Sequence, residues 1–204
     1  MRWLLTGFLI LVLYYKGIAQ LYFGARTDYA LPVASTFVIL GNGDYNEDGV
    51  EDLVVSNFNG SSVSIFIGLG GGTFASAVNY PTTANPGAVT SLDVNGDSHL
   101  DLSIAMCGGS FNILMGSGTG TFGAPQNYAA GNCPQYAQPG DFNEDGKVDF
   151  VAANYLSSNF SIHFGDGTGA FPLNSTYPTG TNPGLAATDL NQDKIGRASC
   201  RERV

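Results

Sequence analysis

Basic residues are almost absent from most of this chain. Only Arg26 and Lys147, of eight Lys and Arg residues, fall between residues 21 and 193, whereas that stretch holds all but one of the 17 acidic residues. Such a surface would repel a phosphate backbone, which excludes a nucleic-acid partner. Eleven of the acids lie in four short D-x-N-x-D stretches. Acid packed so locally indicates that cations belong there.

Helical periodicity and catalytic side chains are also scarce. No stretch keeps a 3.6-residue apolar period, and 28 glycines favour tight turns between many strands. The chain has only two His and three Cys, and we find no Ser-His-Asp, Cys-His or zinc-type arrangement. We therefore expect no enzymatic activity from this chain.

Long apolar runs are limited to the N-terminus. Arg2 precedes an apolar run from Leu4 to Tyr15, and small residues follow in GIAQ. We predict that residues 1–20 are a secretory signal peptide and that the protein is secreted; a signal anchor is the alternative. The run is shorter than the ~20 residues that cross a bilayer. Membrane attachment is expected only if a transmembrane helix lies in a missing C-terminal part.

The chain is built from repeats. Asp44 has counterparts at Asp93, Asp141 and Asp189, at spacings of 49, 48 and 48 residues. Two other groups of segments recur at nearly the same spacing: VSIFIG, FNILMG and FSIHFG, and GGGTF, GTGTF and GTGAF. Each unit contains runs such as FVIL and DLVVSN on either side of the acidic stretch, an alternating run such as Ser62–Ile67, and a fourth run after a Gly-rich turn. Four strands per ~45 residues are typical of a β-propeller blade.

We therefore predict an all-β fold of β-propeller blades with four antiparallel strands each. Residues 21–193 would supply three whole blades and partial first and last blades. Because a closed propeller takes roughly 4–8 blades, the expected shape is an open arc of an incomplete propeller. An open β-solenoid is the alternative architecture.

The fourth acidic stretch breaks off after Asp193. The residues IGRASCRERV follow Lys194 and match one reading frame of a common sequencing-library adapter. We interpret residues 194–204 as adapter read-through that is not native; a genuine basic tail is the alternative.

The acidic stretches have the chemistry of a calcium site. Ca²⁺ takes 6–8 oxygen ligands from carboxylates, amides and carbonyls, and positions one, three, five and nine of each stretch supply oxygen side chains. Position seven would add a backbone carbonyl. No His or Cys side chain takes part, so Zn²⁺ fits poorly. The predicted ligands are Asp44, Asn46, Asp48, Val50, Asp52, Asp93, Asn95, Asp97, His99, Asp101, Asp141, Asn143, Asp145, Lys147, Asp149, Asp189, Asn191 and Asp193.

Other interpretations of the loops are weaker. An EF-hand needs Glu at position twelve and flanking helices, and this chain has Val55, Ile104 or Ala152 there. A metal-free Asx-rich turn that caps strands is the remaining alternative. Ser98 replaces the position-six glycine, so the turn of the Asp93 loop is either strained or differs there, and we expect this loop to bind most weakly. We expect the His99 imidazole to face solvent and His163 to be a packed or rim side chain.

The pattern D-x-N-x-D-G-x-x-D-L, followed by V-S-I-x-x-G and G-x-G-x-F, resembles the FG-GAP/VCBS repeat of integrin α-subunit propellers and many secreted proteins. The resemblance covers residues 21–193, although a literal Gly-Ala-Pro occurs only at 123–125. It implies calcium-stabilised blades outside the cell, with Asp44, Asn46, Asp48 and Asp52 and their counterparts as ligands.

Two cysteines and three sequons complete the predicted sites. Cys107 and Cys133 would emerge at the end of the blades opposite the acidic loops, where a disulfide between them is plausible in a secreted protein; two free thiols are the alternative. Asn59, Asn159 and Asn174 begin N-x-[ST] glycosylation sequons.

Two functions remain open at this stage. The first is a non-catalytic extracellular binding or adhesion module, with an unknown protein or glycan as its ligand. The second is an accessory propeller domain of a secreted or surface hydrolase or lyase whose catalytic part is missing. Recognition loops vary freely on a propeller, so the sequence does not identify the ligand.

Overall fold

The computed structural model describes residues 10–15, 18–23, 28–29, 31, 40–179, 183–188 and 197–202, with side chains at 28–29, 31 and 40–179. In these ranges the regular elements are β-strands and two short 3-10 helices, which confirms the all-β prediction. The elements are β1 Ile10–Tyr15, β2 Ile18–Phe23, β3 Leu40–Gly43, β4 Asp52–Asn57, η1 Phe58–Gly60, β5 Ser62–Phe66, β6 Gly68–Gly70, β7 Thr73–Phe74, β8 Val78–Pro81, β9 Pro86–Leu92, β10 Asp101–Met106, β11 Ser110–Leu114, β12 Gln126–Ala129, β13 Pro134–Gly140, β14 Asp149–Asn154, η2 Tyr155–Ser157, β15 Asn159–Phe164, β16 Leu173–Pro178, β17 Pro183–Thr188 and β18 Arg197–Glu202.

Three antiparallel sheets of four strands form the predicted blades. The first blade has the strand order β3-β4-β5-β8, the second β9-β10-β11-β12 and the third β13-β14-β15-β16. The run DLVVSN is β4, and the alternating run forms β5 from Ser62 to Phe66. The Gly-rich turn before β8 folds into a small hairpin of β6 and β7. Of the run FVIL, only Leu40 lies in the described residues, where it begins β3.

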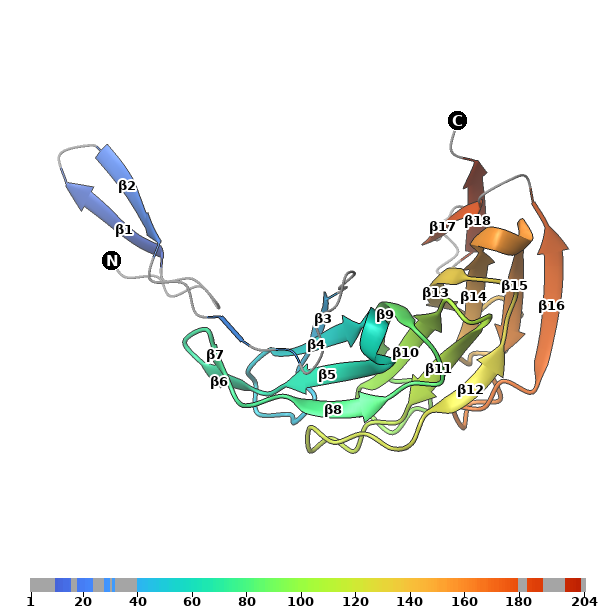
Figure 1. The fold of residues 1–204 in the computed structure, drawn as a ribbon, viewed down its shortest axis with the longest axis horizontal. Helices are drawn as coiled ribbons and strands as arrows, with labels where there is room; N and C mark the ends of the chain where they lie inside the picture. Colours follow the sequence, from blue (N-terminus) through green and yellow to red (C-terminus); the bar gives the residue numbers. More distant parts are fainter. Residues whose placement is uncertain are drawn as a thin grey trace.

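The blades follow one another along an arc. Figure 1 shows β8, β12 and β16 on its convex side, whereas β3, β9 and β13 lie on the concave side. The acidic loops and the Gly-rich hairpins share one end of the blades, called here the acidic-loop end. The turns after β4, β10 and β14 and the links between blades share the opposite end, called here the link end.

Alternating side chains of neighbouring blades form two hydrophobic cores. Val63 and Ile65 on β5 pack against Leu102 and Ile104 on β10, and each of these four side chains is at most 1 % exposed. Phe111 and Ile113 on β11 pack in the same way against the third blade. The period-two pattern therefore buries one face of each blade in each junction, which is worth roughly 2 kcal/mol per large side chain.

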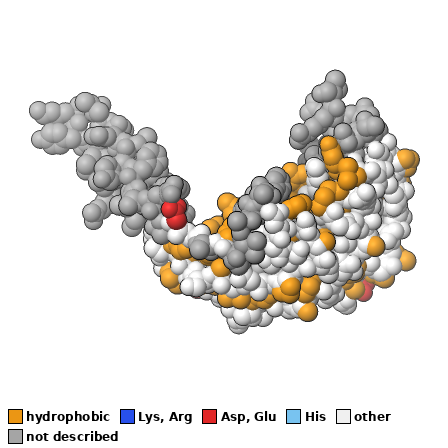
Figure 2. Space-filling model, viewed as in Figure 1, with side chains coloured by type: hydrophobic (Ala, Val, Ile, Leu, Met, Phe, Trp, Pro, Cys, Tyr) orange, Lys and Arg blue, Asp and Glu red, His pale blue; other side chains and the backbone are white. Residues whose placement is uncertain are grey.

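Two hairpins lie outside the blades. β1 pairs with β2, and β17 pairs with β18. These pairings do not test a signal peptide at 1–20 or adapter read-through at 194–204, which stay predictions. Figure 2 shows hydrophobic side chains on both the concave and the convex side of the described surface. Within the described ranges, none of the helices has the length and apolar character to cross a membrane.

Candidate metal-binding loops

Three acidic loops connect the first and second strands of the blades, at residues 44–51, 93–100 and 141–148. The first aspartate of each loop holds the turn together. Asp44 accepts hydrogen bonds from the backbone N–H groups of Asp48, at 3.1 Å, and Gly49, at 2.8 Å. Asp93 and Asp141 accept the same position-six bond at 2.8 Å. This carboxylate therefore satisfies backbone donors that the tight turn would otherwise leave unpaired.

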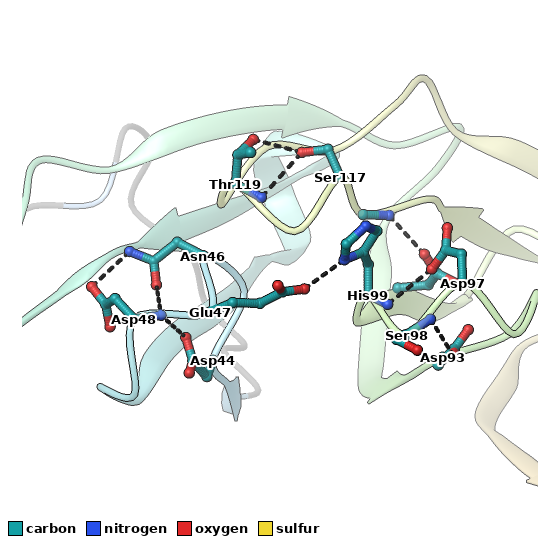
Figure 3. A network of polar contacts seen from close by, with 12 residues as sticks. Asp44, Asn46, Glu47, Asp48, Asp93, Asp97, Ser98, His99, Ser117 and Thr119 are labelled. Carbon is teal, nitrogen blue, oxygen red and sulfur yellow. Dashed lines mark hydrogen bonds and ion pairs between the residues drawn. The ribbon is translucent and has the colours of Figure 1, made fainter.

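Positions three and five form a second set of bonds. Asn46 donates from Nδ2 to Asp48 Oδ2 at 2.8 Å, and its Oδ1 accepts the Asp48 N–H. Asp48 Oδ1 in turn accepts the N–H of Val50 at 2.8 Å. The pairs Asn95–Asp97 and Asn143–Asp145 repeat this arrangement. Figure 3 shows Asp44, Asn46 and Asp48 around one turn of the first loop.

The ninth aspartate has a structural role that the sequence did not reveal. Asp52 is fully buried, and its two oxygens accept the N–H groups of Tyr45, at 2.8 Å, and Gly68, at 2.7 Å. Burial raises the pKa of Asp52, while the two backbone bonds act against that rise. Asp101 and Asp149 form the same two bonds in their blades. Each carboxylate thus fastens its acidic loop to a glycine one or two residues after the third strand of the blade.

The glycine at the end of V-S-I-x-x-G is explained by this contact. A Cβ on Gly68 would lie 2.4 Å from the carbonyl oxygen of Glu51, and one on Gly116 would lie 2.1 Å from that of Leu100. Only glycine lets the two backbones approach this closely. The repeated glycine is therefore a sequence signal for the Asp52-type bridge.

Each acidic loop places two residues in the left-handed region. These are positions four and six: Glu47 and Gly49, Gly96 and Ser98, and Glu144 and Gly146. Each loop therefore has one glycine and one residue with a side chain at these places. Ser98 is strained at φ +72°, as expected, but Gly96 relieves the strain at position four of the same loop. Backbone strain alone does not set the Asp93 loop apart.

The first two loops touch each other. His99 Nδ1 lies 2.5 Å from Glu47 Oε1 (Figure 3). The imidazole, which we expected to face solvent, is partly exposed in this contact. The hydrogen bond to Glu47 raises the pKa of His99. The N–H of Gly120 also donates to the carbonyl of Tyr45 at 2.7 Å, which brings the hairpin of the second blade over the loop of the first.

The donor chemistry of the loops fits Ca²⁺. Each loop offers three carboxylates and one amide and no nitrogen or sulfur side-chain ligand at positions one, three, five and nine. The carboxylates are engaged with backbone N–H groups, and the part of the chain with described side chains contains no group of three His, Cys, Asp or Glu residues arranged to hold a metal ion. Each carboxylate oxygen keeps a further lone pair, so bonds to the loop leave acceptor capacity for a cation. Asp189, Asn191 and Asp193 lie outside the described residues.

The remaining predicted site residues lie away from these loops. Cys107 and Cys133 form a disulfide at the link end, with an Sγ–Sγ distance of 2.09 Å. Asn59 lies in η1 and Asn159 begins β15, both also at the link end, whereas Asn174 is exposed on the edge strand β16. His163 is 1 % exposed and packed between blades, as expected.

Comparison with solved structures finds partial likeness. A chain in the structure of the Photorhabdus luminescens Tc holotoxin pore matches 94% of this chain with 19% identity and a TM-score of 0.47. A chain in the crystal structure of BBS1N in complex with ARL6DN, soaked with lead, matches 72% of this chain with 14% identity and a TM-score of 0.35. This chain spans 10% and 58% of the lengths of these two chains. No curated protein matches it.

A family model for the FG-GAP-like repeat matches residues 44–104 and again residues 93–152. Each match begins at the first aspartate of an acidic loop and continues into the second strand of the next blade. The repeat period, the four-stranded blades and the family match agree, and the chain belongs to the FG-GAP-like repeat family.

Proposed function

We propose that this protein is a non-catalytic extracellular binding module whose blades are stabilised by Ca²⁺ in the acidic loops. The observation that carries the proposal is the repetition of one oxygen-only donor set at one end of three successive blades. Asp44, Asn46 and Asp48 and their counterparts would supply side-chain oxygens, and Val50, His99 and Lys147 backbone carbonyls. A bound cation would offset the repulsion among closely spaced carboxylates.

Secretion, which the sequence predicts, would agree with the same proposal. The predicted signal peptide would deliver the chain to a compartment where Ca²⁺ is plentiful and disulfides persist. At a Ca²⁺ concentration of about 100 times Kd, each site would stabilise the folded state by about 3 kcal/mol. The partner would be an extracellular protein or a glycan, recognised by surface loops rather than by the calcium sites.

The test is calorimetric titration of the full chain with Ca²⁺ after removal of divalent ions with a chelator. The proposal expects heat of binding, a raised melting temperature with Ca²⁺, and a smaller effect with Mg²⁺. Asp48→Asn removes a charge but keeps the oxygen that accepts the Val50 N–H, so it should weaken binding without unfolding the loop. Asp166→Asn is the matched control, since Asp166 is exposed and outside the acidic loops. Absence of both heat and stabilisation would overturn the calcium proposal.

A further inference from the structure

A disulfide ties the second blade to the third at the link end. Cys107 follows β10 of the second blade, and Cys133 immediately precedes β13 of the third. The carbonyl of Cys133 accepts a hydrogen bond from the Tyr155 N–H at 3.1 Å, so Cys133 is also anchored to η2. The disulfide therefore fastens the β10–β11 turn of one blade to the η2 turn of the next.

The described residues place no disulfide at the junction between the first and second blades. At its link end the Ser61 hydroxyl donates to Asn85 Oδ1 at 3.4 Å, and further contacts lie at the acidic-loop end. There Glu47 contacts His99, and Gly120 bonds to Tyr45. The next junction has Gly96 in the place of Glu47, which provides no side chain, and Lys147 in the place of His99, which pairs with Asp145 of its own loop at 3.7 Å. Phe58 and Asn85 hold the places of the two cysteines at the first junction. The second junction also has a bond at the acidic-loop end, from the Tyr128 hydroxyl to the carbonyl of Gly169 at 3.2 Å. Among the described residues, the difference between the two junctions is therefore the disulfide, which only the second one has.

The disulfide is open to attack from solvent. Cys107 is exposed, and both cysteines line a mostly apolar pocket of about 160 Å³ together with Phe58, Gly87 and Tyr136. Cys133 has a φ of +52°, a conformation that residues with side chains rarely adopt, whereas Asn85 at the equivalent place does not adopt it. Exposed or strained disulfides are the ones that thiols reduce readily.

We propose that the Cys107–Cys133 bond is a reducible staple, opened by a dithiol reductant, that controls the rigidity of the junction between the second and third blades. A thiolate of the reductant attacks Sγ of Cys107, a mixed disulfide forms, and Cys133 leaves as a thiolate that takes a proton. The second thiol of the reductant then loses its proton and displaces Cys107, which is protonated in turn. The protein disulfide gains two electrons and two protons, and the dithiol is oxidised to a disulfide.

Opening the staple is expected to act locally. The bond closes a loop across a sequence separation of 26 residues, and the packed core with Phe111 and Phe150 would remain in place. The β10–β11 turn and the start of β13 would lose their covalent tie. The first junction has no disulfide among its described residues, so it should not respond.

The experiment is hydrogen exchange with mass spectrometry on the full chain, before and after treatment with dithiothreitol under native conditions. The third cysteine is first removed by Cys200→Ser, so that only one pair can react. After reduction, amides of residues 107–111 and 130–137 should exchange roughly ten- to a hundredfold faster, and those of residues 52–66 should not change. The measurement is repeated with Ca²⁺ and with chelator, because the staple does not depend on the calcium proposal.

The matched variant is Cys107→Phe with Cys133→Asn, which gives the second junction the residues that the first junction has at these two places. In the folded variant the backbone amides should exchange at the same rate with and without dithiothreitol. If this variant fails to fold, reduced wild-type protein still provides the comparison. A bond that resists dithiothreitol until guanidinium unfolds the chain would overturn the proposal. Reduction without faster exchange at residues 130–137 would overturn it as well.

Discussion

The hydroxyl of Tyr80 accepts a hydrogen bond from the backbone N–H of Phe122 across the junction between the first and second blades, at 3.3 Å. Their rings also meet edge to face, with centroids 5.6 Å apart. Tyr29 makes the same contact with Phe74, at 3.0 Å and 5.6 Å. The hydroxyl of Tyr128 donates to the carbonyl of Gly169 in the next hairpin at 3.2 Å, and its ring meets Phe171 edge to face. A tyrosine on one unit thus repeatedly holds the Gly-rich hairpin of the next.

Replacing Tyr80 with Phe should remove this bond and keep the ring packing. We expect the free energy of unfolding to fall by about 1 kcal/mol, because the N–H of Phe122 loses its partner. Urea unfolding followed by fluorescence measures the change. Tyr136→Phe is the control, since Tyr136 is 44 % exposed and has no such partner role. Equal stabilities for both variants would show that the hydroxyl contributes nothing across the junction.

We expect Gly116→Ala to lower the free energy of unfolding strongly. The added Cβ would lie 2.1 Å from the carbonyl oxygen of Leu100, so the end of the acidic loop and the segment after β11 must separate, which strains the bond from the Gly116 N–H to Asp101. We expect a loss of about 3 kcal/mol in unfolding free energy, measured by thermal unfolding. Gly123→Ala is the matched control, because its nearest atom lies 3.7 Å away. Similar losses in both variants would rule out the close approach as the cause.

Single substitutions at Ser98 and Gly96 test the backbone strain of the second acidic loop. Ser98→Gly should stabilise the protein by about 1 kcal/mol, because Ser98 has a φ of +72°. Gly96→Ala should destabilise it by a similar amount, since Gly96 has a φ of +79°. Both values are measured in chelator by differential scanning calorimetry. Ser98→Ala is the control that leaves the strain in place, and a gain as large as that of Ser98→Gly would contradict the account.

The blades could be predicted because each landmark in the repeat encodes local chemistry. The alternation at Ser62–Ile67, the D-x-N-x-D turn and the Gly-rich hairpin each specify a short segment, and together they fix four strands per unit. The role of Asp52 could not be predicted in the same way. A ligand and a buried acceptor for two backbone N–H groups look alike in sequence, and only the fold brings Gly68 against that carboxylate.

The contacts between blades also could not be predicted from the sequence. Phe74 and Tyr80 keep a fixed spacing within one unit, but the tyrosine bonds to the phenylalanine of the following unit. A period shows which residues are equivalent and not which copies meet. Of the two junctions between the described blades, only the first has a contact like that of Glu47 with His99, so no repeated sequence pattern predicted it.

His163 should make stability depend on pH. Burial lowers the pKa of His163 to about 4 from an ordinary value of 6.5, and the ring packs edge to face on Phe111 with centroids 4.8 Å apart. The unfolded chain therefore binds a proton between these pH values while the folded chain does not. The contribution of the neutral imidazole is fully present above pH 6.5 and is lost as pH falls towards 4.

His163→Leu should remove this dependence of stability on pH. Leucine is a suitable replacement because Leu114 holds the equivalent place on β11. Between pH 7.5 and pH 4.5 the wild type should lose roughly 2–3 kcal/mol more unfolding free energy than the variant. Burial also raises the pKa values of Asp52, Asp101 and Asp149, but both proteins share these groups, so their effect cancels in the difference. Urea unfolding at the two pH values provides the measurement. His99→Gln is the comparison variant: the pKa of His99 is raised rather than lowered, so its removal should not abolish the loss of stability towards acid pH. Among the described residues, His163 is the one histidine that is buried between blades. If the stability of His163→Leu depended on pH as strongly as that of the wild type, the acid sensitivity would come from groups other than this histidine.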